Sequence, residues 1–220
     1  MGMLIKNGTL VTAADTFAAD LLIEEGVIAL IGSNLNVEGN TVVDANGKLL
    51  LPGGIDVHTH LDLPFGGTSS SDDFFTGHRA AAFGGTTSHI DFVIQPIGGS
   101  LHNGLATWRE KAEGRASIDY GFHMAITDLR DEVMQEIPSL VDEGITSLKL
   151  FMAYKGVFQV DDGTLYRALL TARENGMLVM VHAENGDVIV ERRNALLAEG
   201  KTEPHYHAVA KPAIIEGEAT

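Results

Sequence analysis

The stretch Leu50-Leu-Pro-Gly-Gly-Ile-Asp-Val-His-Thr-His60 is the first of five apolar, strand-like runs in this 220-residue chain. The other runs are residues 86–93, 120–126, 147–152 and 178–182. Amphipathic segments typical of helices lie between and after them, at residues 72–83, 101–113, 129–143, 164–175 and 187–199. This alternation, repeated roughly every 25–35 residues, predicts βα units with parallel strands.

Glycine marks the predicted end of every helical segment. A glycine directly after a helix is the residue that most easily adopts the left-handed conformation of a C-terminal cap. We expect such caps at Gly84, Gly114, Gly144, Gly176 and Gly200.

Five βα units in series are compatible with an open, doubly wound sheet or with a (β/α)₈ barrel. No Gly-x-Gly-x-x-Gly motif follows the first strand, which weakens the dinucleotide-binding form of the open sheet. Polar residues that can bind metals stand at several C-terminal strand ends, which favours the barrel. We therefore predict an α/β fold in which residues 51–220 form the first five units of a TIM-like barrel, an incomplete one.

Residues 1–50 predict a separate, small β unit. The segment LLIEEGVIALIG, residues 21–32, alternates in polarity around a Glu-Glu-Gly turn. Asn46-Gly47 lies between apolar runs, and this pair is the strongest short signal for a β-hairpin. No helical period of useful length occurs before about residue 70.

Composition excludes several classes of protein. Acidic residues outnumber basic ones 30 to 15, and the formal charge of −15 argues against nucleic-acid binding. There are no cysteines, so disulfides and thiolate metal sites are excluded. No segment has the layout of a signal peptide or the length of a membrane helix, so we expect a cytoplasmic protein without a membrane partner.

His58 and His60 are the first candidate metal ligands. Residues two apart on a strand point to the same side, so both imidazoles project together from a strand end. Such a pair suits Zn²⁺, Mn²⁺ or Co²⁺. The alternative is a pair of surface or structural histidines, and the position after Pro-Gly-Gly at a strand end favours the metal.

His182 and Lys149 are the next candidates. His182 ends the apolar run 178–182, where a structural histidine is the alternative to a ligand. Lys149 lies inside an apolar strand, where a charged amine is costly. Lys149 is either an edge residue with its stem on apolar surface, or a buried amine of lowered pKa. Such an amine can take up CO₂, and the resulting carbamate has two oxygens that can bridge two metals.

These residues, with their neighbours, resemble the cyclic amidohydrolases, and in detail the D-hydantoinase/dihydropyrimidinase branch. The similar segments are PGGIDVHTHLDLPF (52–65), FMAYK (151–155), VDDGTLY (160–166) and Val-His182-Ala-Glu-Asn. The resemblance implies a barrel beside a β-sandwich built from both chain termini, a binuclear metal site and a homotetramer. It implies that His58 and His60 hold one metal, that His182 holds the other, and that carboxylated Lys149 bridges them.

The resemblance also assigns roles around the substrate. Tyr154 would donate a hydrogen bond to the oxyanion, where the alternative is a tyrosine that only packs its loop. Phe65, Phe151 and Phe158 are candidates for the apolar substrate pocket, although aromatic residues near strand ends often belong to the core. His205 and His207 are expected in a loop. Four further histidines receive no role: His78, His89, His102 and His123.

The predicted reaction is hydrolysis of a small cyclic amide, a hydantoin or 5,6-dihydropyrimidine, to an N-carbamoyl amino acid. The alternatives are an allantoinase or dihydroorotase, which share the ligand set, and a non-catalytic dihydropyrimidinase-like scaffold protein. In the family, a further histidine of the sixth strand and an aspartate of the eighth complete the site. Neither strand is present here, so we expect these 220 residues alone not to be a competent hydrolase.

Overall fold

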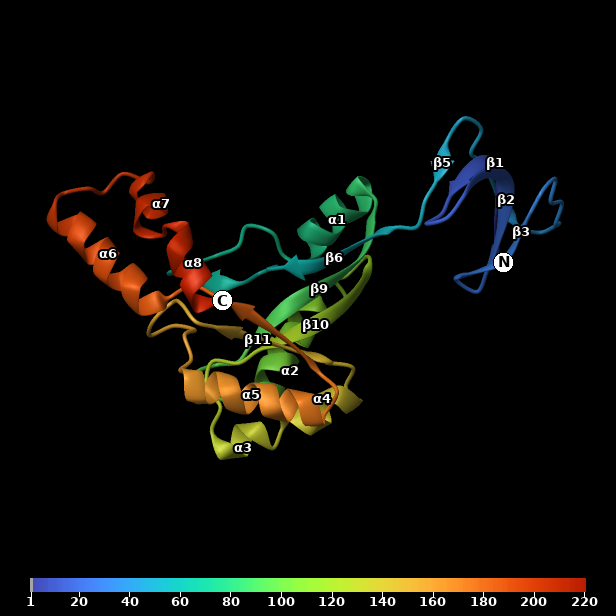
Figure 1. The fold of residues 1–220 in the computed structure, drawn as a ribbon. Helices are drawn as coiled ribbons and strands as arrows, with labels where there is room; N and C mark the ends of the chain where they lie inside the picture. Colours follow the sequence, from blue (N-terminus) through green and yellow to red (C-terminus); the bar gives the residue numbers. More distant parts are fainter. Residues whose placement is uncertain (1) are drawn as a thin grey trace. The chain divides into compact units, whose positions relative to one another are not determined.

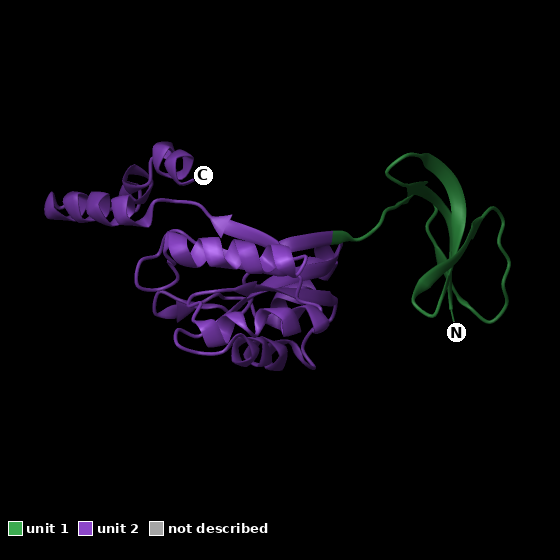
Figure 2. Cartoon of the chain, turned by 60° about the horizontal axis from the view of Figure 1, so that its bottom comes forward, with its two compact units in different colours: residues 1–54 green, residues 55–220 purple. Residues whose placement is uncertain are grey.

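The computed structural model describes residues 2–220. It divides into two compact units, residues 2–54 and residues 55–220, which Figure 2 colours separately. No helix in the described part of the chain is both long and apolar enough to cross a membrane.

The first unit is a five-stranded sheet. Its strands are β1 (Met3–Val11), β2 (Thr16–Glu24), β3 (Val27–Gly32), β4 (Thr41–Asp44) and β5 (Leu49–Leu50). The order is β3-β2-β1-β4, and β5 also pairs with β1. The predicted turn between β2 and β3 is confirmed, with φ of 51° at Glu25 and 79° at Gly26. Leu10, Ala19 and Leu21 form the small core of this unit.

The hairpin predicted at Asn46-Gly47 is wrong. A tight turn is present, because Lys48 N–H donates to the Ala45 carbonyl at 2.9 Å. The flanking strands β4 and β5, however, both pair with β1 in parallel and not with each other. Ala45 N–H also donates to the Lys6 carbonyl of β1 at 2.8 Å. The turn therefore separates two short strands that pair one after the other with β1.

The second unit is built of βα repeats. Its sheet contains β6 (Gly54–Thr59), β9 (Thr86–Ile94), β10 (Asp119–Ala125), β11 (Ser147–Phe151) and β12 (Leu178–His182), in the order β12-β11-β10-β9-β6. The pairs β9–β10, β10–β11 and β11–β12 are parallel. Strands that follow one another in the sequence are therefore neighbours in the sheet, which confirms the first five units of a barrel. A short hairpin of β7 (Pro64–Phe65) and β8 (Thr68–Ser69) follows β6.

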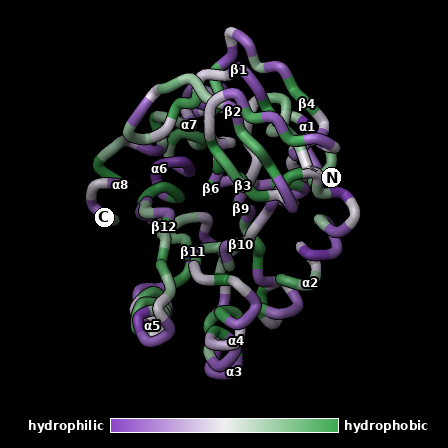
Figure 3. Tube along the Cα trace, turned by 90° about the vertical axis from the view of Figure 1, so that its right-hand side faces the viewer, coloured by the Kyte–Doolittle hydropathy of each residue, from purple (hydrophilic) through white to green (hydrophobic). Residues whose placement is uncertain are grey.

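The helices connect these strands. They are α1 (Phe74–Gly84), α2 (Leu101–Ala112), α3 (Asp131–Met134), α4 (Ile137–Asp142), α5 (Asp162–Glu174), α6 (Gly186–Ala198), α7 (Tyr206–Ala210) and α8 (Ala213–Ala219). Figure 1 shows α2, α4 and α5 along one face of the sheet. In Figure 3, hydrophilic and hydrophobic residues alternate around α5, as expected for a helix with one face on a sheet.

The main core lies between the sheet and these helices. Leu148 and Leu150 of β11 point into it, together with Leu105 and Trp108 of α2. Because side chains alternate along a strand, Lys149 and Phe151 lie on the opposite face of β11. The fold thus separates an apolar layer under the helices from a second face that carries the candidate site.

Two expectations about helices need correction. The segment 129–143 is two helices and not one, because Pro138 follows the first residue of α4 and cannot donate a backbone hydrogen bond back to α3. Gly84 is the last residue of α1, and Gly85 adopts the left-handed cap with φ of 87°. The other four glycine caps are confirmed by positive φ angles, at Gly114, Gly144, Gly176 and Gly200.

The loop expected around His205 and His207 is partly helical. His205 is the N-cap of α7, and His207 lies within that helix. The backbone N–H of His207 donates to the Pro204 carbonyl at 3.0 Å, so the helical turn starts at proline, a residue well suited to a first helical turn.

Candidate metal centre

The end of β6 brings the two predicted histidines together. The ring centroids of His58 and His60 are 5.1 Å apart, with an interplanar angle of 86°. Both rings pack against Phe92 of β9, at centroid distances of 4.6 Å and 5.0 Å. The alternation of side chains along β6 therefore places both imidazoles on the face that also carries Phe92.

Lys149 is buried in the middle of β11, with a relative exposure of 6%. Its Nζ lies 5.8 Å from the ring centroid of Phe92 and 5.3 Å from that of Phe151. No carboxylate of residues 2–220 forms an ion pair with it, and burial lowers the pKa of its amine. The interpretation of Lys149 as an edge residue is thus excluded for this structure.

His182 ends β12, beside β11, where it is the register partner of Phe151. Burial lowers the pKa of His58, and the nearby charges of Lys149 and His182 lower it further. Burial also lowers the pKa of His60, with smaller contributions from His58 and Lys149. The rings of Phe151 and His182 stack with centroids 5.8 Å apart, so His182 lies beside the same aromatic ring as the Lys149 amine.

A carboxylate binds the outer ring nitrogen of His182. Glu184 Oε2 lies 2.5 Å from His182 Nε2 and 2.8 Å from Lys211 Nζ. Burial raises the pKa of Glu184, but the hydrogen bonds from Lys211 and His182 outweigh it and hold that pKa below its usual value. Nδ1 is therefore the nitrogen of His182 left for another ligand while Glu184 stays in place.

The chemistry of this donor set fits metal ions. A metal needs neutral imidazoles, and burial lowers the pKa of both His58 and His60, which favours the neutral rings. The fourth group is an amine, and within residues 2–220 no cluster of three or more His, Asp or Glu side chains forms a metal site. A carbamate on Lys149 would supply the anionic oxygens that the three histidines lack.

The aromatic residues predicted around the substrate also come together. Phe65 and Phe158 stack with centroids 5.6 Å apart, and Phe151 lies 5.1 Å from Phe158. Tyr154 contacts this group, 5.6 Å from Phe65, and lies 5.1 Å from the ring of His182. Its backbone is left-handed, with φ of 67°, a conformation that costs energy in a residue with a side chain.

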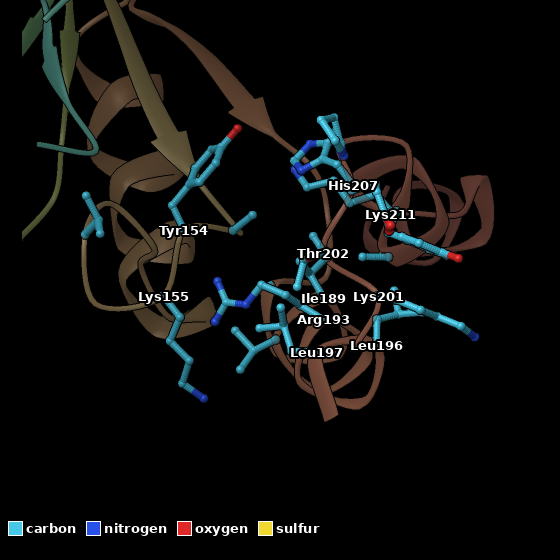
Figure 4. Close-up of a pocket in the computed structure, with 18 of the residues that line it drawn as sticks. Tyr154, Lys155, Ile189, Arg193, Leu196, Leu197, Lys201, Thr202, His207 and Lys211 are labelled. Carbon is cyan, nitrogen blue, oxygen red and sulfur yellow. The ribbon is translucent and has the colours of Figure 1, made fainter. Parts of the chain in front are cut away.

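A cavity of about 440 Å³ opens beside this aromatic group. Tyr154 and Lys155 line one wall, and Figure 4 shows Ile189, Arg193 and Leu197 of α6 facing them. The cavity shares Phe65 and Tyr154 with the candidate site but none of the four predicted metal ligands. The cavity therefore adjoins the candidate metal centre and is distinct from it.

Polar residues without a predicted role lie next to the candidate ligands, His123 on the same face of the sheet as Phe92 and Asp91 on the opposite face. His123 Nε2 lies 3.0 Å from the Val57 carbonyl, one residue before His58. Asp91 accepts hydrogen bonds of 2.8 Å from the Thr59 hydroxyl and from Leu61 N–H. The signal in the sequence was the presence of polar residues inside the apolar strands 86–93 and 120–126.

Known proteins similar to this chain are D-hydantoinases and dihydropyrimidinases. The chain is 58% identical over 221 residues to a D-hydantoinase of Geobacillus stearothermophilus, covering 100% of this chain and 47% of that protein. It is 46% identical over 220 residues to a dihydropyrimidinase of Arabidopsis thaliana, covering 99% of this chain and 41% of that protein. The crystal structure of a dihydropyrimidinase from Brevibacillus agri superposes with a TM-score of 0.97 at 57% identity, covering 100% of this chain and 48% of that one.

The chain spans about half the length of the curated relatives it matches. The resemblance to D-hydantoinases and dihydropyrimidinases, first inferred from short motifs, is confirmed over the whole chain. The model of the amidohydrolase family matches residues 49–218, which include all four predicted metal ligands. The chain belongs to the amidohydrolase family.

Proposed function

We propose that this chain belongs to a metal-dependent hydrolase that opens small cyclic amides, hydantoins or 5,6-dihydropyrimidines, to N-carbamoyl amino acids. The observation that carries the proposal is the placement of His58, His60 and the Lys149 amine around the Phe92 ring, with His182 on β12, the strand next to that of Lys149. The similarity to D-hydantoinases and dihydropyrimidinases supports the choice of substrate class.

His58 and His60 would hold one divalent ion and His182 a second, with Zn²⁺ the first choice and Mn²⁺ or Co²⁺ as alternatives. When bound, the ions would supply a hydroxide nucleophile at neutral pH and polarise the ring carbonyl. The chain's own contribution is to present neutral imidazoles from strands of one rigid sheet.

Lys149 would bridge the ions as a carbamate. In this reaction the lone pair of Nζ attacks the carbon of CO₂, an N–C bond forms, one C–O π bond breaks with its electron pair moving to oxygen, and a proton leaves the nitrogen for solvent. The neutral amine is the reactive form, and burial lowers the pKa of Lys149 toward that form. The aromatic rings of Phe92 and Phe151 beside it leave the amine without a competing carboxylate.

Tyr154 would donate its hydroxyl proton in a hydrogen bond to the oxyanion of the tetrahedral intermediate. The left-handed backbone at this residue is strain of the kind found at functional positions. Phe65, Phe151 and Phe158 would form the apolar wall around the substituent of the substrate ring.

The remaining expectations follow from the family resemblance and the composition. We propose a homotetramer in the cytoplasm. Residues 1–50 would contribute to a β-sandwich domain, and the five-stranded sheet within residues 2–54 supports this assignment. The absence of cysteine from the chain fits a reducing compartment.

The test is hydrolysis by the purified protein loaded with Zn²⁺ or Mn²⁺. Hydantoin, 5,6-dihydrouracil, allantoin and dihydroorotate are offered separately, and products are separated by chromatography. Ring opening of hydantoin or dihydrouracil that is lost in a His58→Ala variant supports the proposal. Turnover of only allantoin or dihydroorotate would assign the alternative enzyme, and no turnover of any ring would favour the scaffold protein.

A further inference from the structure

A buried polar network lies behind the candidate metal centre, on the helix-facing side of the sheet. Residues of β6 alternate, so while His58 and His60 point to one face, Thr59 points to the other. On β9, Phe92 contacts the two histidines, while His89 and Asp91 lie on the opposite side with Thr59. The network therefore touches the ligand segment only through the residue between the two ligands and through Leu61.

Asp91 is the terminal acceptor of this network and is completely buried. Its Oδ2 accepts from the Thr59 hydroxyl and from Leu61 N–H, each at 2.8 Å. Its Oδ1 accepts from Trp108 Nε1 at 3.2 Å and from Phe92 N–H at 2.8 Å. Burial raises the pKa of the carboxyl, but four donors point at it, and only the carboxylate accepts from all of them.

The two histidines behind Thr59 have tautomers that the backbone dictates. His78 Nδ1 accepts from the N–H groups of Ser117 and Ile118 at 3.0 Å and 3.3 Å, so its proton is on Nε2. His78 Nε2 lies 2.6 Å from His89 Nε2, which therefore accepts. The proton of neutral His89 is then on Nδ1, 2.8 Å from the Thr59 hydroxyl.

The hydrogen bonds thus run in one direction. His78 donates to His89, His89 donates to Thr59, and Thr59 donates to Asp91. Since the Thr59 hydroxyl receives one proton and gives one, its rotamer is fixed from both sides. A hydroxyl held in this way, next to an anchored Leu61 N–H, leaves the strand end little freedom to move.

We propose that Asp91 is a positioning residue that, through Thr59 and Leu61, fixes His58 and His60 in the geometry that binds a metal ion. The inference rests on the proposed function, because it needs a metal at these histidines. Groups behind metal ligands typically contribute about 10–100-fold to metal affinity. Asp91 itself lies on the opposite face of the sheet from His58 and His60.

The test compares matched variants of the purified protein. Asp91→Asn keeps the shape but places two N–H donors where acceptors are needed, and Thr59→Val removes the hydroxyl while it keeps a β-branched strand residue. Thr59→Ser keeps the hydroxyl. Glu136→Gln is the control, because Glu136 also accepts from a hydroxyl and a backbone N–H, those of Ser100 and Leu101 at 2.9 Å and 2.7 Å, at the start of α2.

Two quantities are measured: Co²⁺ affinity by chelator competition, with the visible spectrum of the bound ion, and amide exchange of residues 57–61 in metal-free protein. We expect Asp91→Asn and Thr59→Val to lose about 10–100-fold in affinity, to change the spectrum and to exchange faster. Thr59→Ser and Glu136→Gln should resemble the unsubstituted protein. If Asp91→Asn does not fold, the affinity and amide exchange of Thr59→Val still test the proposal.

Unchanged affinity or unchanged exchange in Thr59→Val overturns the inference, as does an equal loss of affinity in Glu136→Gln. A different outcome concerns the proposed function. If the His58→Ala variant binds Co²⁺ as tightly as the unsubstituted protein, the proposed metal site is wrong, and the positioning role of Asp91 is wrong as well.

Discussion

The amino group of Lys149 lies 5.8 Å from the centroid of the Phe92 ring, the same ring that packs against His58 and His60. One aromatic side chain of β9 is thus a common neighbour of a buried amine from β11 and two imidazoles from β6. Among residues 2–220 no carboxylate forms an ion pair with this amine, and burial lowers its pKa.

Replacement of this lysine should remove the bridge between the metals. We expect Lys149→Ala to lose two-metal binding and to recover it in part when short carboxylic acids are added, because they can occupy the place of a carbamate. The metal content of the purified variant, measured by inductively coupled plasma mass spectrometry, checks this expectation. Lys48→Ala, an exposed lysine of the first unit, is the control. Retention of both metals in Lys149→Ala would show that the bridge is not there.

The hydroxyl of Tyr154 should matter for turnover and not for metal content. Loss of one oxyanion donor typically costs about 10²–10³-fold in turnover, so Tyr154→Phe should fall by that factor with its metals intact. Tyr166→Phe, on the exposed side of α5 with 63% relative exposure, should behave as the unsubstituted protein. Near-normal turnover of Tyr154→Phe would show that Tyr154 only packs its loop and does not donate to the oxyanion.

The layer under the helices should be sensitive to cavities. Leu105 of α2 is 1% exposed and belongs to the core against the sheet. Leu105→Ala should lower the free energy of unfolding by about 2–5 kcal/mol, the usual range for a buried leucine. Leu169→Ala, at a position of 46% exposure on α5, should cost far less in the same denaturation experiment. Equal losses would contradict the assignment of the core.

Protonation of His89 should destabilise the fold at low pH. Burial lowers its pKa from 6.5 to about 4, so the unfolded chain takes up the proton first as pH falls. The stability linked to the neutral ring is present above pH 6.5 and is lost between pH 6.5 and about 4. With about 1.4 kcal/mol for each pH unit, this loss is on the order of 3 kcal/mol.

The comparison with His89→Asn isolates that effect, because asparagine keeps an N–H donor near Thr59 but does not titrate. Unfolding free energies of both proteins are measured at several pH values between 7 and 4 by chemical denaturation. The difference between them should shrink steadily across this window. A constant difference would mean that His89 does not titrate there.

The strands of the second unit were predictable because each is a compact apolar run with its own boundary signals. The run 178–182 coincides with β12, and its final histidine, like the strand-end histidines of β6, could be recognised from position alone. The hairpin at Asn46-Gly47 was not predictable correctly, because the turn forms as expected while its flanking strands pair with β1.

The hydrogen-bond network behind the candidate metal centre could not be predicted from the sequence either. His78, His89 and Asp91 are separated by helix and strand, and their contacts depend on the packing of α1 on β9 and on the position of β6 beside β9. A sequence shows that His89 and Asp91 share a strand face, but not which side chain of a neighbouring strand they meet. Candidate ligands could be predicted because their pattern lies within short segments, whereas the residues that support them come from segments far apart in the sequence.

The most direct test of the metal centre is a crystal structure of the protein grown with Zn²⁺, with anomalous diffraction measured on both sides of the zinc absorption edge. We expect two anomalous peaks, one within bonding distance of His58 and His60 and the other within bonding distance of His182. Electron density for a carboxylated Lys149 should lie between the two peaks. Anomalous peaks only elsewhere on the molecule, or an unmodified Lys149 between two bound ions, would contradict this expectation.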